Sequence, residues 1–153
     1  MFLRQVSLLF LITVLVSGLG GNELNGQTIA AGEKHSLAIK EDGTVVAWGS
    51  NSDKQCDVPF RLTNVVAVQA GDRHSLALKE DGTVIAWGAN SHNQCNVPNG
   101  LINVVAIEAS YRYSMALKID GTVVAWGWNI HEQCNVPRRL RDVVEIQAGE
   151  MHS

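Results

Sequence analysis

The stretch Ala70–Pro98 reads AGDRHSLALKEDGTVIAWGANSHNQCNVP, and close copies of it stand before and after it in the chain. The tryptophan recurs every 39 residues, and the cysteine and the proline that follow it keep the same spacing: Trp48, Trp87, Trp126, Cys56, Cys95, Cys134, Pro59, Pro98 and Pro137. Between residues 31–69 and 70–108, 26 of the 39 positions are identical. A fixed period of about 20–50 residues is typical of one supersecondary unit repeated side by side.

The repeated unit has the pattern of β-strands. Residues 64–70 (NVVAVQA) are rich in β-branched side chains, residues 74–79 (HSLALK) alternate, and residues 83–87 (TVIAW) follow after a turn. That turn contains Asp81-Gly82, and the glycine supplies the positive φ that a tight hairpin needs. A short fourth strand is expected at residues 94–98, at a sheet edge because Pro98 cannot donate a ladder hydrogen bond.

Four antiparallel strands in about 40 residues make one propeller blade. The sequence therefore predicts an all-β protein of propeller blades. Full copies are expected at residues 31–69, 70–108 and 109–147, and the start of a fourth at 148–153, all within a partial propeller spanning residues 21–153.

The repeat resembles that of the regulator of chromosome condensation family, most closely its compact bacterial form in β-lactamase inhibitor protein II. The matching motifs are A-G-x-x-H-S (70–75), D-G-T-V (81–84), A-W-G-x-N (86–90) and the final x-V-P. The resemblance spans residues 27–153 and implies a seven-bladed propeller that serves as a protein-binding platform. Seven such blades need about 270 residues. The 153 residues here therefore suggest a fragment of a longer chain, or a ring assembled from several chains.

One loop departs from the family pattern. Where the N-x-x-G-Q motif has glycine, this chain has Lys54, Asn93 and Glu132. If the backbone has a positive φ there, asparagine tolerates it but lysine and glutamate are strained. A reshaped loop is therefore the expectation.

The first twenty residues are expected to be a secretory signal peptide. Arg4 precedes an apolar run at residues 6–16, and small residues follow it. The run is shorter than the roughly 20 residues of a membrane-spanning helix. This predicts a secreted or cell-envelope protein, without a membrane anchor after cleavage. An uncleaved anchor is the alternative.

The net charge of −3 argues against nucleic acid as a partner.

Positions shared by all copies are expected to serve the scaffold. The tryptophans should pack between blades. His35 and His74, each beside a serine, should make structural hydrogen bonds, because neighbours on one strand point to opposite faces.

The pairs His92/Cys95 and His131/Cys134 could be metal ligands, but they lie on separate blades, so no metal site is expected. The three cysteines are expected to be buried free thiols.

Positions where the copies differ are better candidates for function. The third copy gathers Tyr111, Tyr113, Trp128 and Ile130 where its siblings are mostly small or polar. Loops on a rigid scaffold carry binding residues, and aromatic side chains dominate binding energy. We therefore expect a partner-binding patch of Tyr111, Arg112, Trp128 and Ile130. Packing against a neighbouring blade is the alternative.

These observations favour a non-enzymatic, secreted module that binds another protein, with β-lactamase inhibition as a narrower form suggested by the resemblance. One rival is guanine-nucleotide exchange on a small GTPase, which an export signal disfavours. Another is glycan binding through Trp128 and Tyr111. The sequence offers no convergent acid–base pair. No cofactor is expected, and open blade edges could permit self-assembly.

Overall fold

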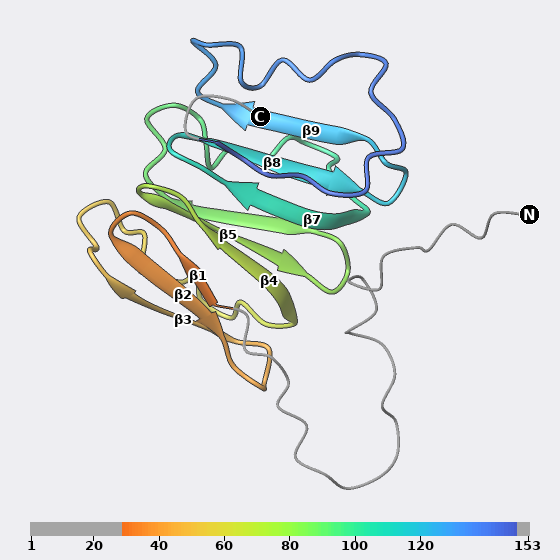
Figure 1. Ribbon diagram of the computed structural model, residues 1–153. Coiled ribbons are helices and arrows are strands. Elements are labelled where there is room, and N and C mark those ends of the chain that lie inside the picture. Colours follow the sequence, from red (N-terminus) through yellow and green to blue (C-terminus); the bar gives the residue numbers. More distant parts are fainter. Residues whose placement is uncertain (1–28, 150–153) are drawn as a thin grey trace, which may run out of the picture.

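The computed structural model describes residues 29–149, which form three antiparallel sheets of three strands each (Figure 1). The first sheet contains β1 (Ile29–Ala31), β2 (His35–Ile39) and β3 (Val45–Gly49). The second contains β4 (Val65–Ala70), β5 (His74–Lys79) and β6 (Val84–Gly88). The third contains β7 (Val104–Ala109), β8 (Tyr113–Lys118) and β9 (Val123–Gly127). The predicted signal peptide lies outside the described residues.

The sheets lie side by side in chain order, from β1–β3 in orange to β7–β9 in teal and light blue (Figure 1). The first strand of each sheet contacts the first strand of the next, so β4 lies between β1 and β7. This is the arrangement of consecutive propeller blades, and the all-β prediction is confirmed. None of the described residues forms a helix long and apolar enough to cross a membrane.

The Asp-Gly hairpins form as predicted and also connect the blades. Gly82 has φ +76°, and the Asp81 side chain accepts a hydrogen bond from the Thr83 backbone nitrogen at 3.0 Å. The Gly82 carbonyl accepts a bond from Val104 of the next blade at 3.2 Å. Each hairpin therefore fixes the position at which the following blade begins.

The predicted fourth strand is absent from the described residues. At residues 94–98 the chain makes successive turns instead, and the Cys95 nitrogen donates to the Asn90 side chain at 2.9 Å. The Val97 nitrogen donates to the Cys95 carbonyl at 3.0 Å. Local side-chain and turn hydrogen bonds thus use backbone groups that a fourth strand would need, an alternative that asparagine readily offers.

The loop that departs from the family pattern keeps one shape in all three copies. Lys54, Asn93 and Glu132 have φ of 66°, 63° and 62°. The turn hydrogen bond that each backbone nitrogen makes is also the same, at 3.2, 3.2 and 3.3 Å. The positive φ is therefore confirmed, and lysine and glutamate adopt the left-handed conformation at an energetic cost. A loop reshaped relative to the family pattern stays a prediction.

Each seam between blades is closed by a tryptophan. Trp87 is 8% exposed and packs with Leu37, Val45 and Leu62 of the first blade, while its indole nitrogen donates to the Gln55 carbonyl at 2.9 Å. Trp126 repeats this arrangement against the second blade, with Gln94 as acceptor. Trp48 has no preceding blade among the described residues and is 50% exposed. The predicted packing role is confirmed at both seams.

A histidine–serine hydrogen bond crosses each seam as well. His35 Nε2 lies 2.9 Å from Ser75 Oγ, and His74 Nε2 lies 3.0 Å from Ser114 Oγ. Ser75 Oγ itself donates to the Gln55 carbonyl at 2.9 Å, so the His35 ring must be the donor to it. The structural role is confirmed, and the partner is the serine of the next blade rather than the adjacent one.

The cysteine thiols are free, as expected, but only partly buried. Cys95 Sγ donates to the Ala89 carbonyl at 3.2 Å, and burial raises the pKa of the Cys95 thiol to about 11. A thiol of that kind is mostly protonated near neutral pH and a poor nucleophile.

Candidate functional site

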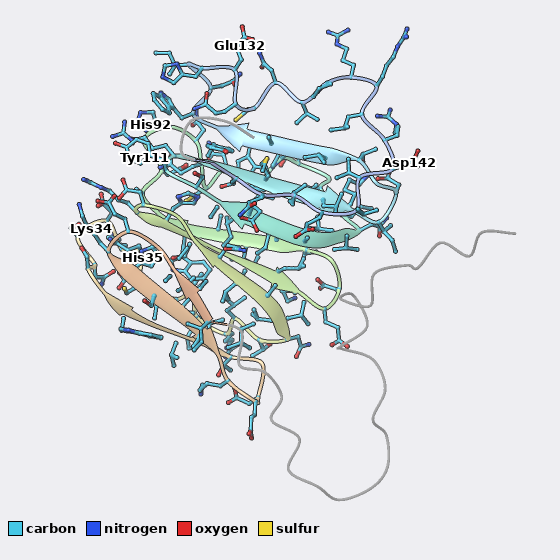
Figure 2. All side chains as sticks on the ribbon, in the orientation of Figure 1. Lys34, His35, His92, Tyr111, Glu132 and Asp142 are labelled. Carbon is cyan, nitrogen blue, oxygen red and sulfur yellow. The ribbon has the colours of Figure 1, made fainter. Side chains whose placement is uncertain are left out.

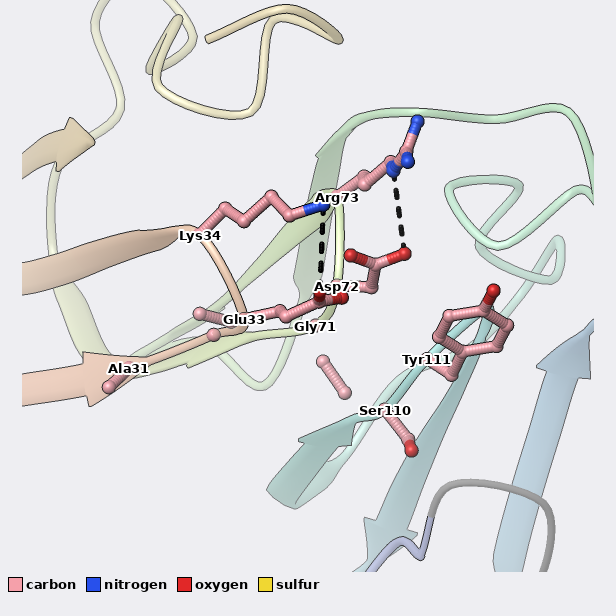
Figure 3. Close-up of a pocket in the computed structure, with 11 residues that line it drawn as sticks. Ala31, Glu33, Lys34, Gly71, Asp72, Arg73, Ser110 and Tyr111 are labelled. Carbon is pink, nitrogen blue, oxygen red and sulfur yellow. Dashed lines mark ion pairs between the residues drawn. The ribbon is translucent and has the colours of Figure 1, made fainter. Parts of the chain in front are cut away.

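The turns between the first and second strands of the blades meet around a hollow of about 660 Å³ (Figure 3). The residues that line it belong to these turns and to the strand ends before them: Ala31, Gly32, Glu33, Lys34, Ala70, Gly71, Asp72, Arg73, Ala109, Ser110 and Tyr111. Lys34, His92 and Tyr111 lie at the same end of the sheets, and Asp142 lies at the opposite end (Figure 2). Lys34, His92 and Tyr111, which come from three different copies, therefore share one end of the blades.

Charges in the first two blades compensate one another at this rim. Lys34 Nζ lies 3.5 Å from Glu33, and Arg73 lies 3.5 Å from Asp72 and 3.6 Å from Asp53. Asp72 is buried, so desolvation raises the pKa of its carboxyl, and the neighbouring Glu33 raises it further. Figure 3 shows the Lys34–Glu33 and Arg73–Asp72 ion pairs at the hollow, with Tyr111 beside Asp72.

The third blade places an aromatic and cationic cluster next to the hollow. The Tyr111 and Trp128 rings meet edge to face, with centroids 6.2 Å apart. The Arg112 guanidinium carbon lies 4.5 Å from the Tyr111 ring centre and 5.8 Å from that of Trp128. Its Nη2 donates to the Tyr111 hydroxyl at 3.0 Å. Three of the four predicted site residues are thus brought together, each partly buried.

Two histidines that the sequence analysis considered only as metal ligands complete this cluster. The His92 and His131 rings lie 6.1 and 5.3 Å from Trp128. Arg112 Nη1 lies 3.4 Å from His92 Nε2, which must accept because a guanidinium only donates. The His92 proton is then on Nδ1, which lies 2.8 Å from Ser91 Oγ. The signal was present in the repeat register, since His92 and His131 replace Asp53.

Two other aromatic or apolar residues of the third copy have different positions. Ile130 is 68% exposed. Tyr113 occupies the histidine position of the seam; it is fully buried, and its hydroxyl donates to the Gly149 carbonyl at 2.8 Å. Tyr113 therefore belongs to the core, and we keep the name rim cluster for His92, Tyr111, Arg112, Trp128 and His131.

The His–Ser pairs of the described residues do not have the arrangement of a catalytic serine and its base. The serine of each His–Ser pair donates to a backbone carbonyl, and the ring Nδ1 of His35 and His74 has no hydrogen-bond partner within residues 29–149. A nucleophilic serine needs a base that is itself oriented by a third group. No three metal-ligating side chains gather anywhere in this part of the chain.

The model of the regulator of chromosome condensation (RCC1) repeat matches residues 27–55, 65–94 and 104–133, together more than half of the chain. The chain belongs to the RCC1 repeat family. No curated protein sequence matches it closely.

Solved structures of RCC1-type proteins share this fold. Prp20p from Saccharomyces cerevisiae, described for its binding to Gsp1p and histones, is 27% identical with a TM-score of 0.61. A second structure of yeast RCC1 (Prp20), bound to Kap60, is 25% identical with the same score. Human WBSCR16, at 22% identity and a TM-score of 0.61, supports the fold alone. These alignments cover 72, 74 and 74% of this chain but 32, 35 and 38% of those proteins. The RCC1 repeats here thus span about a third of their length.

Proposed function

We propose that these RCC1 repeats form a protein-binding module whose contact surface is centred on the rim cluster. The observation that carries the proposal is the placement of Tyr111, Arg112 and Trp128 together on one rim of a rigid sheet scaffold. Tyrosine, tryptophan and arginine are the residues most enriched at binding hot spots. The yeast relatives are described as binding other proteins, which supports a protein as partner.

Finer assignments are part of the same proposal. We place the protein outside the cytoplasm, because its first residues have the pattern of an export signal, and consider inhibition of a secreted enzyme one form of its activity. The rim position of the cluster also suits glycan stacking, and the family resemblance suggests a small GTPase as an alternative partner. Three assays separate these readings: inhibition of a purified β-lactamase, binding to a glycan array, and nucleotide release from a small GTPase.

The experiment that tests protein binding is a double substitution, Tyr111→Ala with Trp128→Ala. The partner is first captured by cross-linking and affinity purification, and its affinity is then measured with purified components. We expect the double variant to keep its folded circular dichroism spectrum and to lose at least about tenfold in affinity.

The matched control changes the same repeat positions in the first blade, Glu33→Ala with Ser50→Ala. This pair should leave the affinity within about twofold, because neither residue belongs to the rim cluster. An unchanged affinity in the Tyr111/Trp128 variant would contradict the proposal. Unfolding of that variant would instead support a packing role for the two aromatic side chains.

A further inference from the structure

The cationic side chain at one repeat position has different partners in the three blades. Lys34, Arg73 and Arg112 stand 39 residues apart on the same turn. Lys34 pairs with Glu33, and Arg73 pairs with both Asp72 and Asp53. Arg112 contacts no carboxylate in the described part of the chain. Its hydrogen-bonding neighbours are the Tyr111 hydroxyl and the His92 ring, both neutral acceptors.

The difference follows from two substitutions in the repeat. Tyr111 stands at the position of Asp72, and His92 stands at the position of Asp53. Both carboxylates that hold Arg73 are therefore replaced around Arg112, one in the second copy and one in the third, although the arginine is kept. What replaces them holds the guanidinium in place, with a ring on one face and hydrogen bonds at 3.0 and 3.4 Å.

A guanidinium fixed in this way is ready to bind an anion. It has five N–H donors in a planar fork that matches a carboxylate, and prior ordering reduces the entropy lost on binding. A small cleft of about 80 Å³ opens beside it. The charged and titratable groups lining that cleft are Asp53, Asp72, Arg73, His92, Tyr111 and Arg112. Arg73 is paired with both aspartates, so Arg112 is the cation of this cleft that has no ion pair among the described residues.

We infer that Arg112 is an anchor for an acidic side chain, aspartate or glutamate, of the protein partner. This rests on the proposed function and names the chemistry of the partner at that site. A carboxylate is the group chosen because the second blade shows carboxylates binding the same guanidinium position. Trp128 and Tyr111 flank the guanidinium, and partial shielding from water strengthens the Coulombic attraction within the resulting ion pair.

The test uses the full chain, labelled with nitrogen-15, and the peptide acetyl-Glu-Glu-Glu-amide as probe. Nuclear magnetic resonance titration follows the Arg112 Nε–H and Trp128 indole N–H signals. We expect both to shift with one saturable curve, and the shifts to weaken as salt is added. The neutral peptide acetyl-Gln-Gln-Gln-amide should leave them unmoved. Equal shifts with the neutral peptide would overturn the inference.

A compensating substitution gives the sharpest variant. His92→Asp restores the carboxylate that Asp53 of the first copy supplies to Arg73, while Tyr111, Arg112 and Trp128 all remain. We expect it to lower the affinity for the acidic peptide by about tenfold or more, as should Arg112→Gln. Arg61→Gln removes an exposed, ring-stacked arginine from another loop and should change the affinity less than twofold. Unchanged affinity in His92→Asp would overturn the inference.

Two further results distinguish this inference from a general oxyanion site and from the proposed function. Inorganic phosphate binding at lower concentration than the peptide would identify an oxyanion site and overturn the choice of carboxylate. If the purified partner loses affinity with the Tyr111/Trp128 variant but not with Arg112→Gln, the acidic anchor fails while the proposed function stands. Loss with both variants supports both.

Discussion

Nε2 of His74 lies 3.0 Å from Oγ of Ser114, a residue forty positions further along the chain and in the next blade. The Ser114 hydroxyl also donates a hydrogen bond to the Gln94 carbonyl at 2.9 Å. The Trp126 indole donates to the same carbonyl at 2.9 Å. One backbone oxygen therefore collects two donors from the following blade, and the buried imidazole completes the group.

This arrangement predicts acid sensitivity of the seam. Burial lowers the pKa of His74 from 6.5 to about 4, so the folded protein binds fewer protons than the unfolded chain between these values. The resulting stability, about 3 kcal/mol, is present above pH 6.5 and is lost as the pH falls towards 4. Urea denaturation from pH 7.5 to 4 should show this decline. His74→Gln should flatten it, whereas His131→Gln, on the exposed rim, should not; an equal slope in both variants would contradict the assignment.

The seam serine can be tested directly. Ser75→Ala leaves the His35 Nε2–H and the Gln55 carbonyl without the hydroxyl between them, in a buried site. We expect a loss of about 1–3 kcal/mol in the free energy of unfolding, measured by urea denaturation. Ser52→Ala is the control, because Ser52 is exposed and bonds only Asp53. A cost below about 0.5 kcal/mol for Ser75→Ala would show that water replaces the hydroxyl.

The tryptophans should differ in their contribution to stability. Trp87→Ala removes a buried ring and an indole hydrogen bond, and should cost about 3–5 kcal/mol. Trp48 has the same repeat position but is half exposed, so Trp48→Ala should cost less than half as much. Thermal unfolding followed by circular dichroism measures both. Equal costs would mean that another surface covers Trp48 in solution.

The strained loop positions offer a gain in stability. Lys54→Gly and Glu132→Gly should each raise the free energy of unfolding by about 0.5–1 kcal/mol. Glycine adopts the observed φ of 66° and 62° without steric cost, although it adds entropy to the unfolded chain. Asn93→Gly is the internal control and should be nearly neutral, because asparagine already tolerates φ 63°. Destabilisation by Lys54→Gly would show that the lysine side chain stabilises the loop by more than the strain costs.

The sequence could predict the blades because their strands, hairpins and tryptophans recur with one period. Local pattern alone could not exclude the fourth strand, since the Asn90–Cys95 hydrogen bond that competes with it depends on the loop's three-dimensional path. The clustering of Tyr111, Arg112 and Trp128 was predictable from variable positions on one copy. Their partnership with His92 was not, because it joins loops of two different blades.

The seam described above connects equivalent positions of adjacent units: histidine to serine, and tryptophan and serine to the glutamine carbonyl. Tandem duplication in multiples of 39 codons therefore reproduces these seam contacts without any new compensating change. Rim residues take no part in those contacts, so they are free to diverge from one unit to the next. Duplication can therefore copy the framework unchanged, while the recognition surface on the rim changes independently.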